Sequence, residues 1–129
     1  MKQFAVQPQG HAVPVMPYSP AIVADGIVYV AGLVSIDENN RLVGGADIGA
    51  QTRQLLINMS RLLEAADSSM RSVLKTTVYL PNREHYAEMN AVYGEFFSAP
   101  LPARATARVD LINPIYLVEI DAYALVESA

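Results

Sequence analysis

The chain has 129 residues, 52% of them hydrophobic and 17% charged, which is enough for one packed domain over residues 1–129 and too little for two. Its net charge of −4 comes without any run of Lys or Arg, which argues against a nucleic-acid partner or an anionic membrane surface. It has no cysteine, which excludes disulfide bonds and thiolate metal sites and fits a reducing cytoplasm, where we expect the protein.

The first 17 residues are expected to be irregular, because residues 7–20 hold four prolines and no hydrophobic period. We expect neither a signal peptide nor a membrane span, since no apolar run approaches the roughly 20 residues that cross a bilayer. Residues 21–37 contain two β-branched runs around Asp25-Gly26, which predicts a hairpin of two strands. The sequence leaves open a short extra strand near Leu42 and Val43.

Two amphipathic helices are predicted after the hairpin. Asp47 can cap the N-terminus of the helix that comes first. Its apolar positions recur at three- and four-residue spacing, namely Ile48, Leu55, Met59, Leu62, Leu63 and Ala66. Residues 72–80 are rich in β-branched residues and predict a strand that ends before Pro81. Asn82 can then cap the second helix. The apolar positions of that helix are Tyr86, Met89, Tyr93, Phe96 and Phe97.

The remaining residues 103–126 predict two strands that pair as a hairpin around a turn at residues 112–115. The resulting order of elements predicts an α+β fold with a mixed sheet of five to six strands. Two helices cover only one face of such a sheet. The other face is therefore expected to be free and to bind further copies of the chain, as a homo-oligomer.

Two arginines lie in the strand predicted for "PARATARVDL", residues 102–111. Because side chains alternate along a strand, Arg104 and Arg108 share one face, and the small apolar residues between them share the face that suits a covering helix. In the hairpin register Arg108 lies opposite Glu119, which predicts a cross-strand ion pair. Arg104 lies near Tyr123 with no carboxylate opposite. It is either a solvated or interface-paired cation or the group that binds an anionic ligand, for which its planar donor fork is suited.

Four segments together resemble the RidA/YjgF (Rid) family of small imine deaminases. They are "MPYSPAIVADG", "DGIVYVAGLVSID", "NAVYGEFFSAPLPAR" and "PARATARVDLINPIYLVEIDAYALV", and the resemblance runs from about Pro17 to Ala124. It implies a chorismate-mutase-like fold and a homotrimer whose sheets form a central barrel, with pockets in the clefts between subunits. It implies no cofactor, and the histidines of the sequence argue against a metal site. His11 and His85 lie far apart in the sequence and lack the spacing of metal ligands.

The resemblance also implies roles for individual residues. Arg104, in the Pro-x-Arg motif, would hold the carboxylate of the substrate, and Glu119, in the Val-Glu-Ile segment, would orient the attacking water. The positions implied to bind substrate are Tyr18, Gly32, Asn90 and Thr106. Many family members have Cys where this chain has Thr106, and Ser where it has Ala31, which bears on substrate preference.

The implied activity is hydrolysis of 2-imino acids or their enamine tautomers, such as 2-aminoacrylate/2-iminopropanoate and 2-iminobutanoate, to a 2-oxo acid and ammonia. One alternative is a deaminase of a pathway-specific substrate, either aminoacrylate in pyrimidine breakdown or 2-aminomuconate. Another is a trimer that binds carboxylates, or acts as a chaperone, without catalysis. The presence of both Arg104 and Glu119 favours an enzyme, because a binding protein needs the cation but not the acid that orients water.

Overall fold

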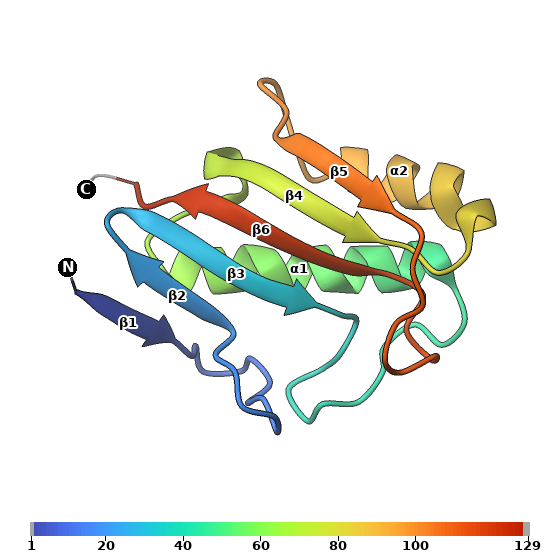
Figure 1. Ribbon diagram of the computed structural model, residues 1–129, viewed down its shortest axis with the longest axis horizontal. Helices are drawn as coiled ribbons and strands as arrows, with labels where there is room; N and C mark the ends of the chain where they lie inside the picture. The colour runs from blue at the N-terminus through green and yellow to red at the C-terminus, as the bar shows by residue number, and fades with distance from the viewer. Residues whose placement is uncertain (1, 128–129) are drawn as a thin grey trace.

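A computed structural model describes residues 2–127 as one mixed six-stranded sheet with two α-helices on one face (Figure 1). The strands, in sheet order, are β1 (Gln3–Val6), β2 (Ala21–Ala24), β3 (Ile27–Leu33), β6 (Glu119–Leu125), β4 (Val73–Tyr79) and β5 (Ala103–Ala107). The helices are α1 (Ile48–Ala65) and α2 (Tyr86–Gly94), with 3-10 turns η1 (Met70–Ser72) and η2 (Arg83–His85). The predicted α+β fold, with five to six strands and both helices on one face, is confirmed. The homotrimeric barrel stays a prediction.

The predicted hairpin is confirmed as β2 and β3, which pair antiparallel. Its two turn residues, Asp25 and Gly26, have φ angles of 51° and 77°. Both values lie in the left-handed region that a two-residue hairpin turn requires, and Asp and Gly are among the residues that tolerate it. The strand expected near Leu42 and Val43 is reduced to a single bridge between Ile36 and Leu42.

The expectation of an irregular N-terminal segment over residues 1–17 is wrong for Gln3–Val6. These residues form β1, which pairs antiparallel with β2 and completes the backbone hydrogen bonds along that edge. Residues 7–20 contain no helix or strand, as their prolines predict. Residue 1 lies outside the described part of the chain.

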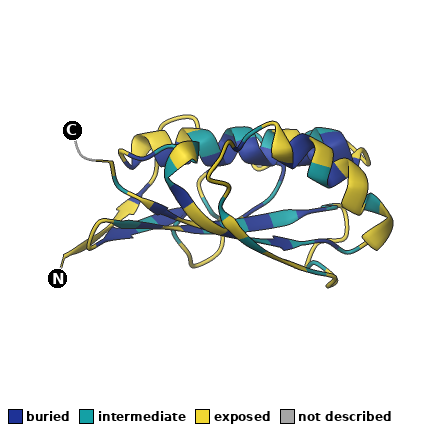
Figure 2. Ribbon diagram, turned by 90° about the horizontal axis from the view of Figure 1, so that it is seen from above, coloured by how far each residue is buried: buried dark blue, intermediate teal, exposed yellow. Residues whose placement is uncertain are grey.

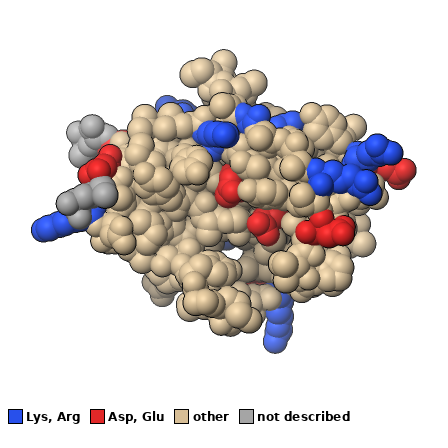
Figure 3. Space-filling view, viewed as in Figure 1, with Lys and Arg blue, Asp and Glu red and all other residues tan. Residues whose placement is uncertain are grey.

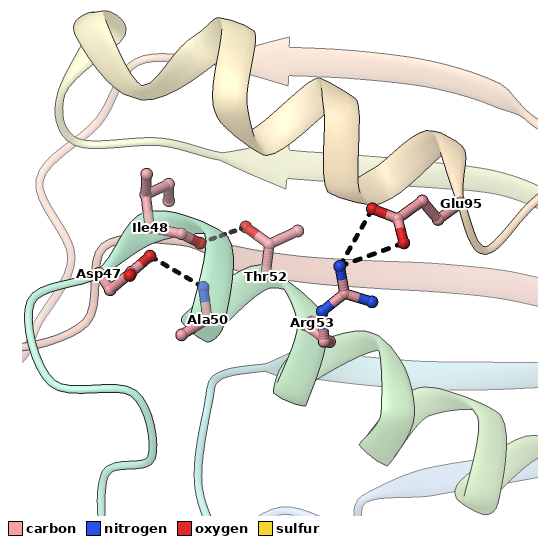
Figure 4. Close-up of polar contacts among 6 residues, drawn as sticks. All are labelled: Asp47, Ile48, Ala50, Thr52, Arg53 and Glu95. Atoms are coloured by element: carbon pink, nitrogen blue, oxygen red, sulfur yellow. Dashed lines mark hydrogen bonds and ion pairs between the residues drawn. The ribbon is translucent and has the colours of Figure 1, made fainter.

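Helix α1 is confirmed with the predicted cap and provides much of the core. The Asp47 carboxylate accepts a hydrogen bond from the backbone N–H of Ala50 at 3.0 Å, and the Thr52 hydroxyl donates to the carbonyl of Ile48 at 2.8 Å (Figure 4). Figure 2 shows the buried residues gathered between the helical layer and the sheet. The fully buried side chains of α1 include Leu55, Leu56, Met59, Leu62 and Leu63.

The end of α2 is joined to α1 by an exposed ion pair. Arg53 lies 3.0 Å from the carboxylate of Glu95, the residue that follows α2 (Figure 4). The second predicted helix begins with the turn η2, whose first backbone groups are capped by Asn82, and the α-helix proper starts at Tyr86. Phe96 and Phe97, predicted as part of the helix, follow its end, where Phe97 is buried.

The predicted hairpin of the last two strands is wrong. β5 pairs parallel with β4, while β6 pairs antiparallel with β3 on one side and β4 on the other. The reason is that β4, α2 and β5 form a crossover unit, in which the helix returns the chain so that the next strand runs in the same direction. β6 therefore lies two strands from β5, with β4 between them.

Two expectations about β5 fail with that pairing. Arg108 follows the end of β5 and does not form the predicted ion pair with Glu119. Within residues 2–127 the one ion pair is that of Arg53 with Glu95. The alternation along β5 is present but its orientation is reversed. Arg104 is beside the buried Thr76 and faces α2, so the small apolar residues of β5 lie on the open face.

The sheet face opposite the helices is free, as predicted. Figure 3 looks onto this face and shows acidic side chains near its middle, with basic side chains above and to the right of them. Tyr29 and Tyr123 pack there edge to face with ring centroids 5.6 Å apart, and both are exposed. Leu74 and Leu125 are also exposed large hydrophobic residues. Such a face is suited to contact with another protein surface.

Candidate active site

The Arg104 guanidinium is held by aromatic rings of α2. It lies 4.9 Å from the ring centroid of Tyr93 and 5.8 Å from that of Tyr86, and its Nη2 donates to the Tyr86 hydroxyl at 3.3 Å. Tyr93 is itself fixed, because its hydroxyl is 2.8 Å from the Oγ1 of the buried Thr76. Rings stabilise the cation through their faces and leave most of its N–H donors free. Arg104 can therefore bind an anion with little rearrangement.

Two of the predicted substrate-binding residues lie on the same side of the sheet as Arg104. Thr106 follows two positions along β5 and lines a cavity together with Tyr86. Asn90 is four residues after Tyr86 on α2, a spacing that places the two on one helix face. We call Arg104, Thr106 and Asn90 the arginine half.

Glu119 lies on the open face of the sheet, directly over Gly32. A methyl group at Gly32 would overlap the carboxylate of Glu119, so this position of β3 must remain glycine for the carboxylate to lie there. Burial raises the pKa of Glu119, and the negative charge of Asp121 raises it further. Asp121 is oriented by hydrogen bonds from the Tyr79 hydroxyl at 3.0 Å and the Thr77 backbone N–H at 3.2 Å.

Tyr18 is joined to this group through Gly32. It is exposed, and it lines a small cavity of about 30 Å³ together with Gly32 and His11. Burial lowers the pKa of His11. We call Glu119, Gly32 and Tyr18 the glutamate half.

The structure divides the six predicted site residues into these two halves and does not bring the halves together within one chain. Arg104 and Glu119 lie on opposite faces of the sheet, on strands separated by β4. Their neighbours on β4 are Thr76 and Tyr79, so the two residues are roughly 10 Å apart across the strands and roughly 10 Å apart along them. A short substrate cannot touch both side chains of one chain.

The loop before Glu119 is attached to helix α1 by the buried side chain of Gln51. Its Nε2 donates to the carbonyls of Gly45 at 2.6 Å and Ile115 at 3.1 Å. Its Oε1 accepts from the backbone N–H of Leu117 at 2.9 Å. One side chain thus satisfies three backbone groups, two of which lie within four residues of Glu119, and fixes the start of β6.

Replacing Gln51 with leucine is expected to lower the free energy of unfolding by about 2–4 kcal/mol, because it leaves three backbone groups without their partner. Urea denaturation measures this. Gln54→Leu is the matched control on the same helix, since Gln54 makes one side-chain hydrogen bond, to Asn58 at 2.9 Å. A loss for Gln51→Leu no larger than that for the control would contradict the role given to Gln51.

Several residues that touch the two halves were not predicted from the sequence. Tyr86 and Tyr93 were predicted to be part of an apolar helix face, yet both contact Arg104. Asp121 had no predicted role, and its negative charge raises the pKa of Glu119. The one available signal was the tyrosine hydroxyl, which needs a polar partner when it is partly buried.

Residues 2–127 hold no cluster of three or more His, Asp or Glu side chains suited to a metal ion.

In the part of the chain that the structure describes, no helix is both long enough and apolar enough to span a bilayer.

Residues 9–126 match the family model described as Endoribonuclease L-PSP. The chain belongs to this family, which is the RidA/YjgF (Rid) family predicted from the sequence. The 3-aminoacrylate deaminase RutC of Acinetobacter baylyi is 38% identical over 124 residues, which are 96% of this chain and 98% of the relative. A RutC family protein of Pyrococcus horikoshii is 41% identical over 114 residues, 88% of this chain and 90% of the relative.

Solved structures of the family share the fold. A Rid family protein from Yersinia pestis, described as of unknown function, is 31% identical with a TM-score of 0.91, and the match covers 97% of this chain and all of the other. The structure described as a putative endoribonuclease from Thermotoga maritima is 32% identical with a TM-score of 0.90, covering 99% of this chain and all of the other.

Proposed function

We propose that the protein is a hydrolytic deaminase of short 2-imino acids and their enamine tautomers, with 2-iminopropanoate and 2-iminobutanoate as substrates. The imine carbon gains the oxygen of one water molecule, the carbon–nitrogen bond breaks, and a 2-oxo acid and ammonia leave. Membership in the Rid family and similarity to a deaminase of an enamine acid support a reaction of this class. The observation that carries the proposal is the pair of Arg104 and Glu119, each with a local environment suited to its task.

Arg104 is proposed to hold the substrate carboxylate. Its guanidinium already lies against Tyr86 and Tyr93, so charge-assisted hydrogen bonds to a carboxylate cost little further ordering. Holding one end of a reactive imine in place is a large part of the catalysis that this reaction needs. Thr106 and Asn90 are proposed to complete this side of the pocket.

Glu119 is proposed to be the general base and acid. Its carboxylate accepts a proton from the attacking water, and the same proton then passes to the departing nitrogen. The raised pKa of Glu119 brings it closer to neutral pH, where a carboxyl group both takes up and gives back a proton effectively. Gly32 and Tyr18 are proposed to form the surrounding wall.

We also propose that the complete pocket forms between subunits of a homotrimer, with the arginine half from one subunit and the glutamate half from the next. The separation of the two halves within one chain supports this arrangement. So does the open sheet face with its exposed Tyr29, Leu74 and Leu125, which is suited to burial against further copies.

A second candidate substrate is 3-aminoacrylate, because the relative from Acinetobacter baylyi bears the name of that deaminase. This substrate keeps the carboxylate and the enamine but places the nitrogen one carbon further away. RNA cleavage, which the family description names, is not proposed, because the net charge of −4 does not suit an RNA backbone.

The test is ammonia release from freshly generated 2-iminopropanoate, 2-iminobutanoate and 3-aminoacrylate, with and without the protein. Faster release from the two 2-imino acids is the expected result. Acceleration of 3-aminoacrylate alone would replace the first substrate class by the second. Rates equal to buffer for all three would refute the proposed deaminase and leave a binding protein as the better account.

A further inference from the structure

Two further arginines, Arg83 and Arg108, line one cavity at the edge of the sheet that carries Arg104. The cavity has a volume of about 360 Å³ and is lined by Leu80, Arg83, Tyr86, Thr106 and Arg108. Arg83 belongs to the turn η2, and Arg108 follows the end of β5. With Arg104, three of the nine Lys and Arg residues of an acidic chain therefore gather at this edge of the sheet.

The charges of these two arginines are not neutralised within the described chain. No carboxylate of residues 2–127 lies within ion-pair distance of Arg83 or Arg108. The Nε of Arg108 donates to the carbonyl of Pro81 at 3.3 Å, a contact that positions its guanidinium without neutralising its charge. Two cations that line one cavity repel each other, and an anion placed between them removes that repulsion.

The cavity is continuous with the arginine half of the candidate active site. Tyr86 lines the cavity and also contacts Arg104, and Thr106 lines it from the strand that carries Arg104. Arg104 and Arg108 are four residues apart along an extended chain, which separates their Cα atoms by about 13 Å. Long arginine side chains can close part of that distance, so a ligand that reaches both needs two acidic groups several bonds apart.

We propose that the preferred substrate is the imine of a dicarboxylic acid, with one carboxylate on Arg104 and the second on Arg83 and Arg108. This inference rests on the proposed function, since it names the substrate class of the same pocket. The second carboxylate neutralises the charges of Arg83 and Arg108. It also contributes charge-assisted hydrogen bonds that a monocarboxylic imine cannot make. Arg83 and Arg108 thereby determine specificity and take no part in the bond-breaking step.

The first experiment compares kcat/KM for 2-iminoglutarate with kcat/KM for 2-iminopropanoate. The wild-type protein is expected to favour 2-iminoglutarate, and the double variant Arg83→Gln/Arg108→Gln is expected to lower the ratio of the two values by about tenfold or more. Arg61→Gln is the matched control, because Arg61 is an exposed arginine on α1 outside this cavity. A ratio that stays within twofold of the wild type in the double variant overturns the proposal.

The second experiment does not depend on catalysis. NMR titration of the wild-type protein with glutarate and with butanoate is expected to give a Kd for glutarate about tenfold lower, and equal affinities overturn the proposal. If no imine were hydrolysed, the proposed function would fail, and this titration would still decide whether the cavity binds a second carboxylate.

Discussion

Replacing Arg104 with alanine is expected to lower kcat/KM for 2-iminopropanoate by about 100-fold or more. The variant loses two charge-assisted hydrogen bonds to the substrate carboxylate, each of roughly 1.5 kcal/mol or more, and tenfold in rate corresponds to about 1.4 kcal/mol. The fold should tolerate the change, because Arg104 is only partly buried and lies on the edge strand β5. Steady-state ammonia release measures the loss.

Two further variants separate carboxylate binding from a general effect of charge. Arg104→Lys keeps the positive charge but lacks the planar guanidinium fork. Its activity is therefore expected to lie between that of Arg104→Ala and that of the wild type. Arg53→Ala removes an exposed cation whose partner is Glu95, and its activity is expected to stay near that of the wild type. If Arg104→Ala retained more than a third of the wild-type kcat/KM, Arg104 would not be the carboxylate anchor.

Replacing Glu119 with glutamine is expected to lower kcat by about 100-fold to 10,000-fold, the range that general acid–base catalysis contributes. Glutamine has nearly the same size and fits over Gly32. The change therefore removes the group that takes up and releases a proton, with little change in packing. A variant with more than a tenth of the wild-type kcat would contradict the role of Glu119.

The pH dependence of the wild-type enzyme provides a second measure of the same residue. Glu119 accepts a proton only as a carboxylate, so kcat/KM is expected to fall as the pH drops through its pKa, which burial and Asp121 raise above the ordinary value for glutamate. Asp121→Asn removes a neighbouring negative charge and therefore lowers the pKa of Glu119. The acidic limb of the profile should then move to lower pH, and an unmoved or oppositely moved limb would contradict the assignment.

Local sequence patterns predicted the elements of the fold well. The Asp25-Gly26 pair identified the hairpin because its turn needs two successive residues in the left-handed conformation, which few residue types tolerate. The apolar spacing and Asp47 identified helix α1 because both act within a few residues along the chain.

Pairing between distant strands could not be predicted in the same way. Adjacent strands at the end of the chain suggested a hairpin, but β5 pairs with β4 across α2, and β6 lies between β3 and β4. The alanines of β5 suggested a buried face, whereas the aromatic rings of α2 receive Arg104 on that side. The identity of the site residues came from the family resemblance, and their division into two halves became visible only with the strand order.

Subunit complementation tests most directly whether Arg104 of one subunit works with Glu119 of another. Arg104→Ala and Glu119→Gln proteins, each nearly inactive, are unfolded together in equal amounts and refolded. Random assembly into trimers places both intact residues in about one quarter of the pockets, so the mixture should recover about one quarter of the wild-type activity. A mixture that forms mixed trimers of normal mass but stays as inactive as its components would contradict the claim.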